Sequence, residues 1–176
     1  MQNVKRYPRK MVLLHWLMAV VILGMIACGW YMSELEGEDP LRPLLYDLHK
    51  AFGVTAFVLV VIRLLVRFTS RKPALPNSFR PLEVKAAATG HALLYVLMIA
   101  VPLSGYAMST LFGFSVKWFG LELPKLLPVD RLLARDVKEM HELFAYSLLA
   151  VIAIHVAAVI KHYLFEKVNL LSRMKW

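Results

Sequence analysis

The sequence predicts an all-α integral membrane protein, a bundle of four transmembrane helices with both termini in the cytoplasm. Apolar residues make up 59% of the 176 residues and charged residues 19%, against roughly 45–50% and about 25% in soluble domains. Four apolar segments lie at about residues 11–32, 48–68, 90–112 and 141–163. Each is long enough to cross a hydrocarbon core of about 30 Å. The connecting loops are short, so a single transmembrane domain is expected to cover residues 1–176.

The first segment, residues 11–32, contains no acidic or strongly basic side chain. A cleaved signal peptide is disfavoured because the apolar stretch is too long and no small-residue cleavage site follows it. The second segment is interrupted by Arg63 and Arg67 near its end. The third contains Pro102 and Gly105, which are expected to bend the helix and which a membrane bundle tolerates.

The distribution of charge orients these segments. The first ten residues are basic and contain no acid, whereas the loop between the first two segments carries five acidic side chains against Arg42. The next loop and the C-terminal tail are again mainly basic. Basic loops stay in the cytoplasm, so this pattern predicts that both the N-terminus and the C-terminus lie on the cytoplasmic side of the membrane. The net charge of +9 is then a topology signal, and no nucleic-acid partner is expected.

Several site types are disfavoured by the residues present. The single cysteine, Cys28, excludes an internal disulfide framework and cysteine-rich zinc or iron–sulfur sites. Zinc is disfavoured at the histidine pairs, because His141-Glu142 lacks the second histidine of an H-E-x-x-H motif and each pair offers two ligands. The segment VKWFGLELP, with Trp118 and Phe119, reads either as an interfacial element on the outer surface or as an aromatic anchor.

The six histidines, at positions 15, 49, 91, 141, 155 and 162, all lie in or beside a predicted span. Ionisable side chains at membrane depth are costly and therefore candidates for function. Helix capping or hydrogen bonding across the bundle is the alternative for each of them. Their arrangement favours a shared role, because they fall at matching depths on different segments.

His141 and His155 are fourteen residues apart, which places them on one face of a helix and about 21 Å apart along its axis. Depth pairs His49 with His141 on the outer side and His15 with His155 on the inner side. Two stacked imidazole pairs are what two bis-histidine haems require. The haems would be of the non-covalent b type, since no C-x-x-C-H motif exists. Methionine ligation, for example by Met140, remains the alternative.

Two further residues share the face of His49. Gly53, four residues later, is expected to let a flat macrocycle approach, or else to serve helix packing. Arg63, fourteen residues after His49, reaches the level of the inner pair, where it can meet a haem propionate or snorkel to the interface.

These residues together resemble the bacterial cytochrome b561 family over nearly the whole chain. The resemblance rests on His15-Trp16, His49 with Gly53, Gly90-His91, His141-Glu142 with His155, and His162-Tyr163. It implies a four-helix diheme b-type cytochrome of the inner membrane whose axial ligands are His15, His49, His141 and His155. One family member is a superoxide oxidase that passes electrons from periplasmic superoxide to ubiquinone. In that member the residue matching His162 lies at the quinone site, and a Trp stands where this chain has Met140.

The expected function is therefore the transfer of single electrons between a periplasmic donor, superoxide by resemblance, and the ubiquinone pool. The alternatives are a membrane-anchor subunit that relays electrons for a separate redox enzyme, and a histidine-lined transporter or proton channel. His162 lies seven residues after His155, within about 20° of the same face and about 10.5 Å nearer the cytoplasm. There it can hydrogen-bond a quinone carbonyl, with Lys161 and Arg71 or Lys72 at similar depth, or anchor the helix at the interface. The expected partners are membrane lipid, quinone and a periplasmic electron donor.

Overall fold

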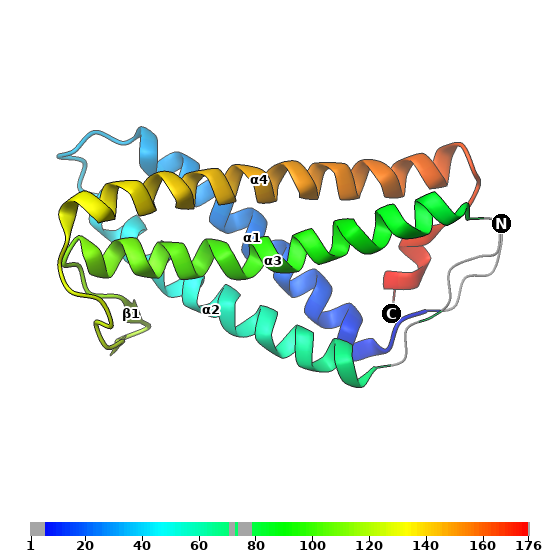
Figure 1. The fold of residues 1–176 in the computed structure, drawn as a ribbon, viewed down its shortest axis with the longest axis horizontal. Helices are drawn as coiled ribbons and strands as arrows, with labels where there is room; N and C mark the ends of the chain where they lie inside the picture. The colour runs from blue at the N-terminus through cyan, green and yellow to red at the C-terminus, as the bar shows by residue number, and fades with distance from the viewer. Residues whose placement is uncertain (1–5, 71–72, 74–78, 176) are drawn as a thin grey trace.

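The computed structural model describes residues 6–70, 73 and 79–175, and it consists mainly of four long helices (Figure 1). Each helix is long and apolar enough to cross a membrane, which confirms the all-α transmembrane bundle. The helices are α1 (Arg9–Glu34), α2 (Arg42–Thr69), α3 (Pro81–Leu111) and α4 (Arg131–Leu164).

The helices extend beyond the apolar segments, most clearly at the starts of α3 and α4. Pro81 occupies the first turn of α3, where its missing N–H costs nothing, and the Glu83 carboxylate accepts the Arg80 backbone N–H at 3.1 Å. The Asp130 carboxylate accepts the first backbone N–H groups of α4. Hydropathy marks the part of a helix that suits hydrocarbon, whereas these caps determine where the helix itself begins.

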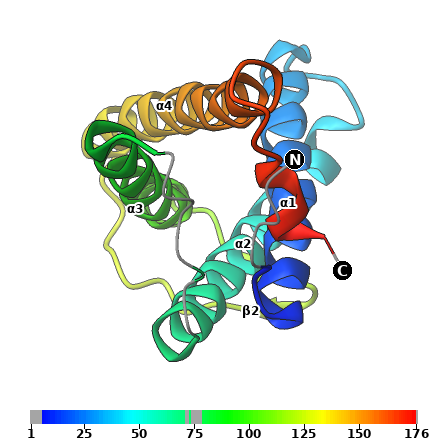
Figure 2. The same cartoon turned by 90° about the vertical axis from the view of Figure 1, so that its right-hand side faces the viewer.

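The helices pack as neighbours in sequence, α1 on α2, α2 on α3 and α3 on α4 (Figure 2). Among the described residues, the backbone of α4 does not pack as closely against α1 or α2. Large apolar side chains such as Val20, Leu65 and Ile154 are more than 60% exposed, as helices that face lipid require.

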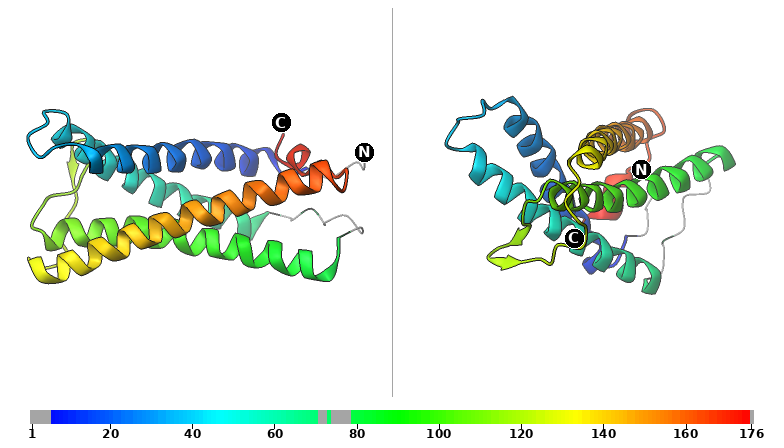
Figure 3. Two further views of the ribbon diagram at one scale, coloured as in Figure 1. Left: turned by 90° about the horizontal axis from the view of Figure 1, so that it is seen from above. Right: turned by 60° about the vertical axis from the view of Figure 1, so that its left-hand side comes forward.

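Both described ends of the chain lie at one end of the bundle (Figures 1 and 3). The Tyr7 backbone N–H donates to the Arg173 carbonyl at 3.0 Å, and the Trp16 indole N–H donates to the Met174 carbonyl at 2.8 Å. Arg173 and Met174 belong to the short 3₁₀ helix η1 (Leu170–Met174). The loop between α1 and α2 lies at the opposite end.

The predicted interfacial segment is a small hairpin of β1 (Lys117–Trp118) and β2 (Leu121–Glu122) at that opposite end. Phe119 and Gly120 form its two-residue loop and both have positive φ, 46° and 96°, as a type I′ turn requires. The Trp118 indole N–H donates to the Thr55 hydroxyl of α2 at 3.0 Å. The hairpin therefore packs on α2 and is not only a surface anchor.

Candidate functional site

The outer pair of histidines meets between α2 and α4. The His49 and His141 rings have centroids 6.4 Å apart and planes at 80°. His141 Nδ1 donates to the Val101 carbonyl of α3 at 2.9 Å, which fixes the tautomer and leaves the Nε2 lone pair free to bind a metal. His49 Nδ1 is buried and has no hydrogen-bond partner among the described residues.

The inner pair meets between α1 and α4. The His15 and His155 rings have centroids 6.5 Å apart and planes at 65°. Sequence reasoning set His91 apart from this pair, but its ring, on α3, has its centroid 5.4 Å from that of His155. The signal that could have placed it there is its depth, because Gly90-His91 opens the third apolar segment from the inner side.

The ring separations provide a test of whether these residues fit a haem. An imidazole nitrogen lies about 2.0 Å from a first-row metal, so two rings on opposite sides of one iron have centroids about 6 Å apart. The separations of 6.4 and 6.5 Å in the two predicted pairs agree with this requirement. The centroids of the His91 and His155 rings are 5.4 Å apart, which is shorter than the separation that two ligands of one iron require.

Arg63 lies beside the inner pair, as its spacing from His49 predicts. Its Nη2 donates to His15 Nδ1 at 3.1 Å, and its guanidinium lies 5.8 Å from the centre of the Tyr95 ring. Among the described residues, the Arg63 Nε has no hydrogen-bond partner and no carboxylate forms an ion pair with the guanidinium. A half-buried guanidinium with no carboxylate partner in the described part of the chain fits an anion from a bound group, such as a haem propionate.

The glycines nearest the outer pair are not the one singled out from the sequence. A Cβ on Gly53 would meet only the Met25 methyl group, at an ordinary 3.7 Å. A Cβ on Gly29 would lie 3.2 Å from His49 Cε1, and one on Gly105 would lie 3.0 Å from His141 Cε1. Gly29 and Gly105 therefore make room for the two imidazoles. Sequence reasoning missed this role because it depends on how α1 and α3 are rotated in the bundle.

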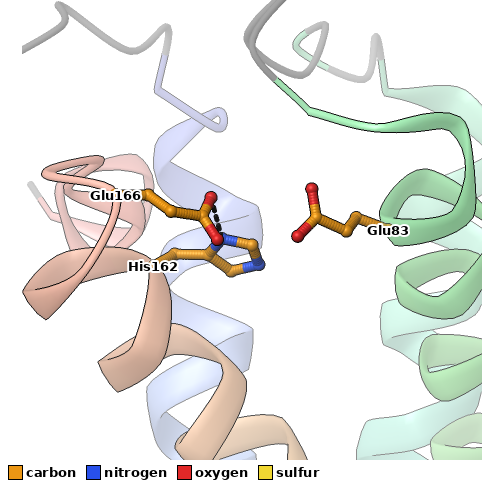
Figure 4. Close-up of side chains that lie close together, drawn as sticks. All are labelled: Glu83, His162 and Glu166. Carbon is orange, nitrogen blue, oxygen red and sulfur yellow. Dashed lines mark hydrogen bonds and ion pairs between the residues drawn. The ribbon is translucent and has the colours of Figure 1, made fainter.

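His162 lies at the end of the bundle that holds the termini, near the end of α4 (Figure 4). The His162 side chain is buried, and its Nδ1 lies 2.6 Å from a Glu166 carboxylate oxygen. The centroids of the His162 and Phe79 rings are 4.6 Å apart. The Lys161 ammonium, and then the His162 ring, hold the pKa of the Glu166 carboxyl below its ordinary value. Arg71 and Lys72, expected at this depth, lie outside the described residues.

Lys161 connects this region to α3 through ion pairs with Glu83 at 3.0 Å and Glu166 at 2.9 Å. The structure thus brings the predicted site residues into three groups along α4. The outer pair comes first, the inner pair with His91 and Arg63 second, and His162 with its charged neighbours last.

The chain is similar to a known protein family and to several named proteins. The family model described as prokaryotic cytochrome b561 matches residues 6–176. The chain is 33% identical to cytochrome b561 homolog 2 of Escherichia coli strain K12, over 91% of this chain and 86% of that protein. It is 33% identical to the probable superoxide oxidase CybB of Yersinia pestis, over 97% of this chain and 96% of that protein. It is 27% identical to cytochrome b561 homolog 1 of the same E. coli strain, over 96% of each chain.

Proposed function

The chain belongs to the prokaryotic cytochrome b561 family, and on that premise we propose that it carries single electrons across the bacterial inner membrane, from periplasmic superoxide to ubiquinone. The family makes it a multi-pass membrane b-type cytochrome of electron transfer. The diheme path, the donor and the acceptor are the proposal. The observation that carries it is the presence of two histidine pairs, each spaced for one iron, at two levels of α4.

In this proposal His49 and His141 would hold an outer haem b, and His15 and His155 would hold an inner one. Haem iron cycles between two oxidation states and so accepts and releases one electron at a time. The protein's share is to hold each imidazole in place. The Val101 carbonyl does so for His141 by accepting its Nδ1 proton, which also makes the ring a stronger ligand.

His15 is held differently, and Arg63 explains the difference. Because Arg63 donates to His15 Nδ1, that nitrogen accepts and the proton of the neutral His15 ring lies on Nε2. A nitrogen that binds a metal must instead offer its lone pair, so His15 Nε2 is not ready to bind iron in this arrangement. We therefore propose that Arg63 pairs with a propionate when haem is bound and releases His15 Nδ1. This single movement would give the guanidinium a counter-ion, and it would allow the His15 proton to lie on Nδ1 so that Nε2 offers its lone pair.

Superoxide is proposed as the donor because a relative matched along nearly its whole length bears the name of a superoxide oxidase. Two superoxide ions give up one electron each and leave as two molecules of oxygen, and the two electrons with two protons convert one ubiquinone to ubiquinol. Lys50 follows His49 directly, and Lys117 of the hairpin lines a pocket with Asp47, so two cations lie near the start of α2. Asp47 pairs with Lys50 at 2.8 Å, which weakens the attraction of this surface for an anion.

The acceptor end is proposed at His162, beyond the inner pair. Changing His162 to Ala is expected to keep both haems and their reduction by the donor, but to slow reoxidation by ubiquinone by about a hundredfold, the lower end of the usual contribution of a positioned proton donor. Stopped-flow absorbance of the haem bands measures both phases. Tyr163→Ala, at the 41% exposed neighbouring position, is the control and should behave as the unmodified protein. Equal reoxidation rates in the two variants would return His162 to the role of a helix anchor.

The proposed orientation places both termini in the cytoplasm. A reporter enzyme that is active only in the cytoplasm, fused to the C-terminus, is expected to be active, and the same reporter in the loop between α1 and α2 is expected to be silent. The acidic loop and the basic ends of the chain support this result. The opposite pattern would place His162 in the periplasm and reverse the assignment of donor and acceptor ends.

A further inference from the structure

Three side chains that sequence reasoning did not connect converge at the end of the bundle that holds the termini (Figure 4). Glu83 comes from the first turn of α3, His162 from the last turn of α4, and Glu166 from just beyond it. Each offers one nitrogen or oxygen atom, and these atoms all lie within 4.8 Å of one another. Both carboxylates and the imidazole therefore face one small volume.

A cation already lies between the two carboxylates. The Lys161 ammonium is 3.0 Å from Glu83 and 2.9 Å from Glu166, so both side chains are arranged around one positive charge. The Lys161 side chain is 53% exposed, and its flexible stem can swing into water without disturbing the buried His162 ring. The position is thus accessible to another cation.

We propose that Glu83, His162 and Glu166 form a zinc site in which Lys161 is the competing internal cation. One imidazole nitrogen and two carboxylate oxygens are ordinary zinc ligands, at about 2.0–2.2 Å from the ion, and water completes the usual four. A divalent ion also neutralises the two carboxylates, which one ammonium does only in part. At these bond lengths two ligand atoms lie about 3.4 Å apart, so atoms that now lie up to 4.8 Å apart must approach by about 1 Å, a shift within reach of rotations of the two Glu side chains.

Zinc bound there would occupy His162, so it would reversibly inhibit the exit of electrons to quinone. This consequence rests on the proposed function, but the binding itself does not. The site would make the quinone end sensitive to the free zinc concentration on that side of the membrane.

Direct binding tests the proposal. The untagged, haem-loaded protein in detergent is titrated with Zn²⁺ alone against a fluorescent zinc chelator, with no electron donor or quinone present. We expect saturable binding of one ion per chain, weakened at least about tenfold by Glu83→Gln or His162→Gln, as loss of a metal-site partner requires. Glu122→Gln, which removes an exposed carboxylate on the hairpin at the other end of the molecule, should leave the affinity unchanged.

The decisive variant is Lys161→Gln, which removes the competing ammonium and replaces it with a neutral polar side chain that is one atom shorter. It is expected to bind Zn²⁺ at least about twofold more tightly, since the two ion pairs no longer oppose entry. A misfolded protein cannot produce this gain, and the haem spectrum reports the fold of every variant. Weaker binding by Lys161→Gln, no saturable binding, or an equal loss in Glu122→Gln and Glu83→Gln would each overturn the zinc site.

The zinc titration, together with a separate stopped-flow measurement of reoxidation with and without Zn²⁺, separates this proposal from the proposed function. Zinc binding that leaves quinone-dependent reoxidation unchanged would retain the metal site and remove His162 from the quinone end. Absence of zinc binding together with slow reoxidation in His162→Ala would remove the metal site and retain the quinone end.

Discussion

His155→Ala is expected to lose the inner haem and to keep the outer one, so that haem content per chain falls by about half. The reason is that His155 and His15 are the pair spaced for one iron at this level, with centroids 6.5 Å apart. The outer pair depends on other residues, His49 and His141, and should be unaffected. A pyridine haemochrome assay against protein concentration gives the haem content, and a redox titration shows whether one of two potentials is lost.

His91→Ala is the matched control for this prediction. Its ring lies closer to His155 than the ring of His15 does, at 5.4 Å, which is too short for the two axial ligands of one iron. Both haems are therefore expected to remain, with a shift in the potential of the inner haem at most. Full haem content in His155→Ala, or loss of a haem in His91→Ala, would show that the inner pair is assigned wrongly.

Gly105→Ala is expected to disturb the outer haem more than any other single added methyl group at the described glycines. The new Cβ would lie 3.0 Å from His141 Cε1 and 3.3 Å from its Nδ1, the atom that donates to Val101. The ring must move, and the hydrogen bond that orients it is lost or lengthened. The loss of such an orienting bond lowers metal affinity by about tenfold to a hundredfold, so we expect partial loss of the outer haem.

Gly90→Ala provides the comparison, since it makes the same change in the same helix where no atom lies within 4 Å of the new Cβ. Its haem content and spectrum should match those of the unmodified protein. Equal haem loss in both variants would mean that the loss does not come from the contact of the new Cβ with His141.

The fold could be predicted from the sequence because a bilayer imposes strict demands on length and polarity. The four apolar segments predict the four helices, and the alternation of charge between the loops predicts their orientation. The helical repeat predicts that His141 and His155 lie on one face of α4. The meeting of Arg63 with the inner pair follows from the same regularity. These features depend on single helices and their depth.

Contacts between helices could not be predicted in this way, because they depend on the rotation and tilt of each helix. The closeness of Gly105 to His141, and of His91 to His155, is fixed by the packing of α3 on α4. The cluster of Glu83 with His162 joins residues about eighty positions apart in the sequence. Sequence spacing disfavours zinc at the histidine pairs. It cannot predict a site whose imidazole and carboxylate ligands come from the ends of two helices that are distant in the sequence.

The proposed path takes electrons from superoxide through two histidine-bound haems to quinone. Stopped-flow mixing of the oxidised protein with a superoxide pulse, with and without ubiquinone, tests it most directly. We predict that the haem bands become reduced in both cases, stay reduced without quinone, and reoxidise when quinone is present. Haems that superoxide does not reduce, or that stay reduced in the presence of quinone, would contradict the claim and would favour an anchor subunit that serves another redox partner.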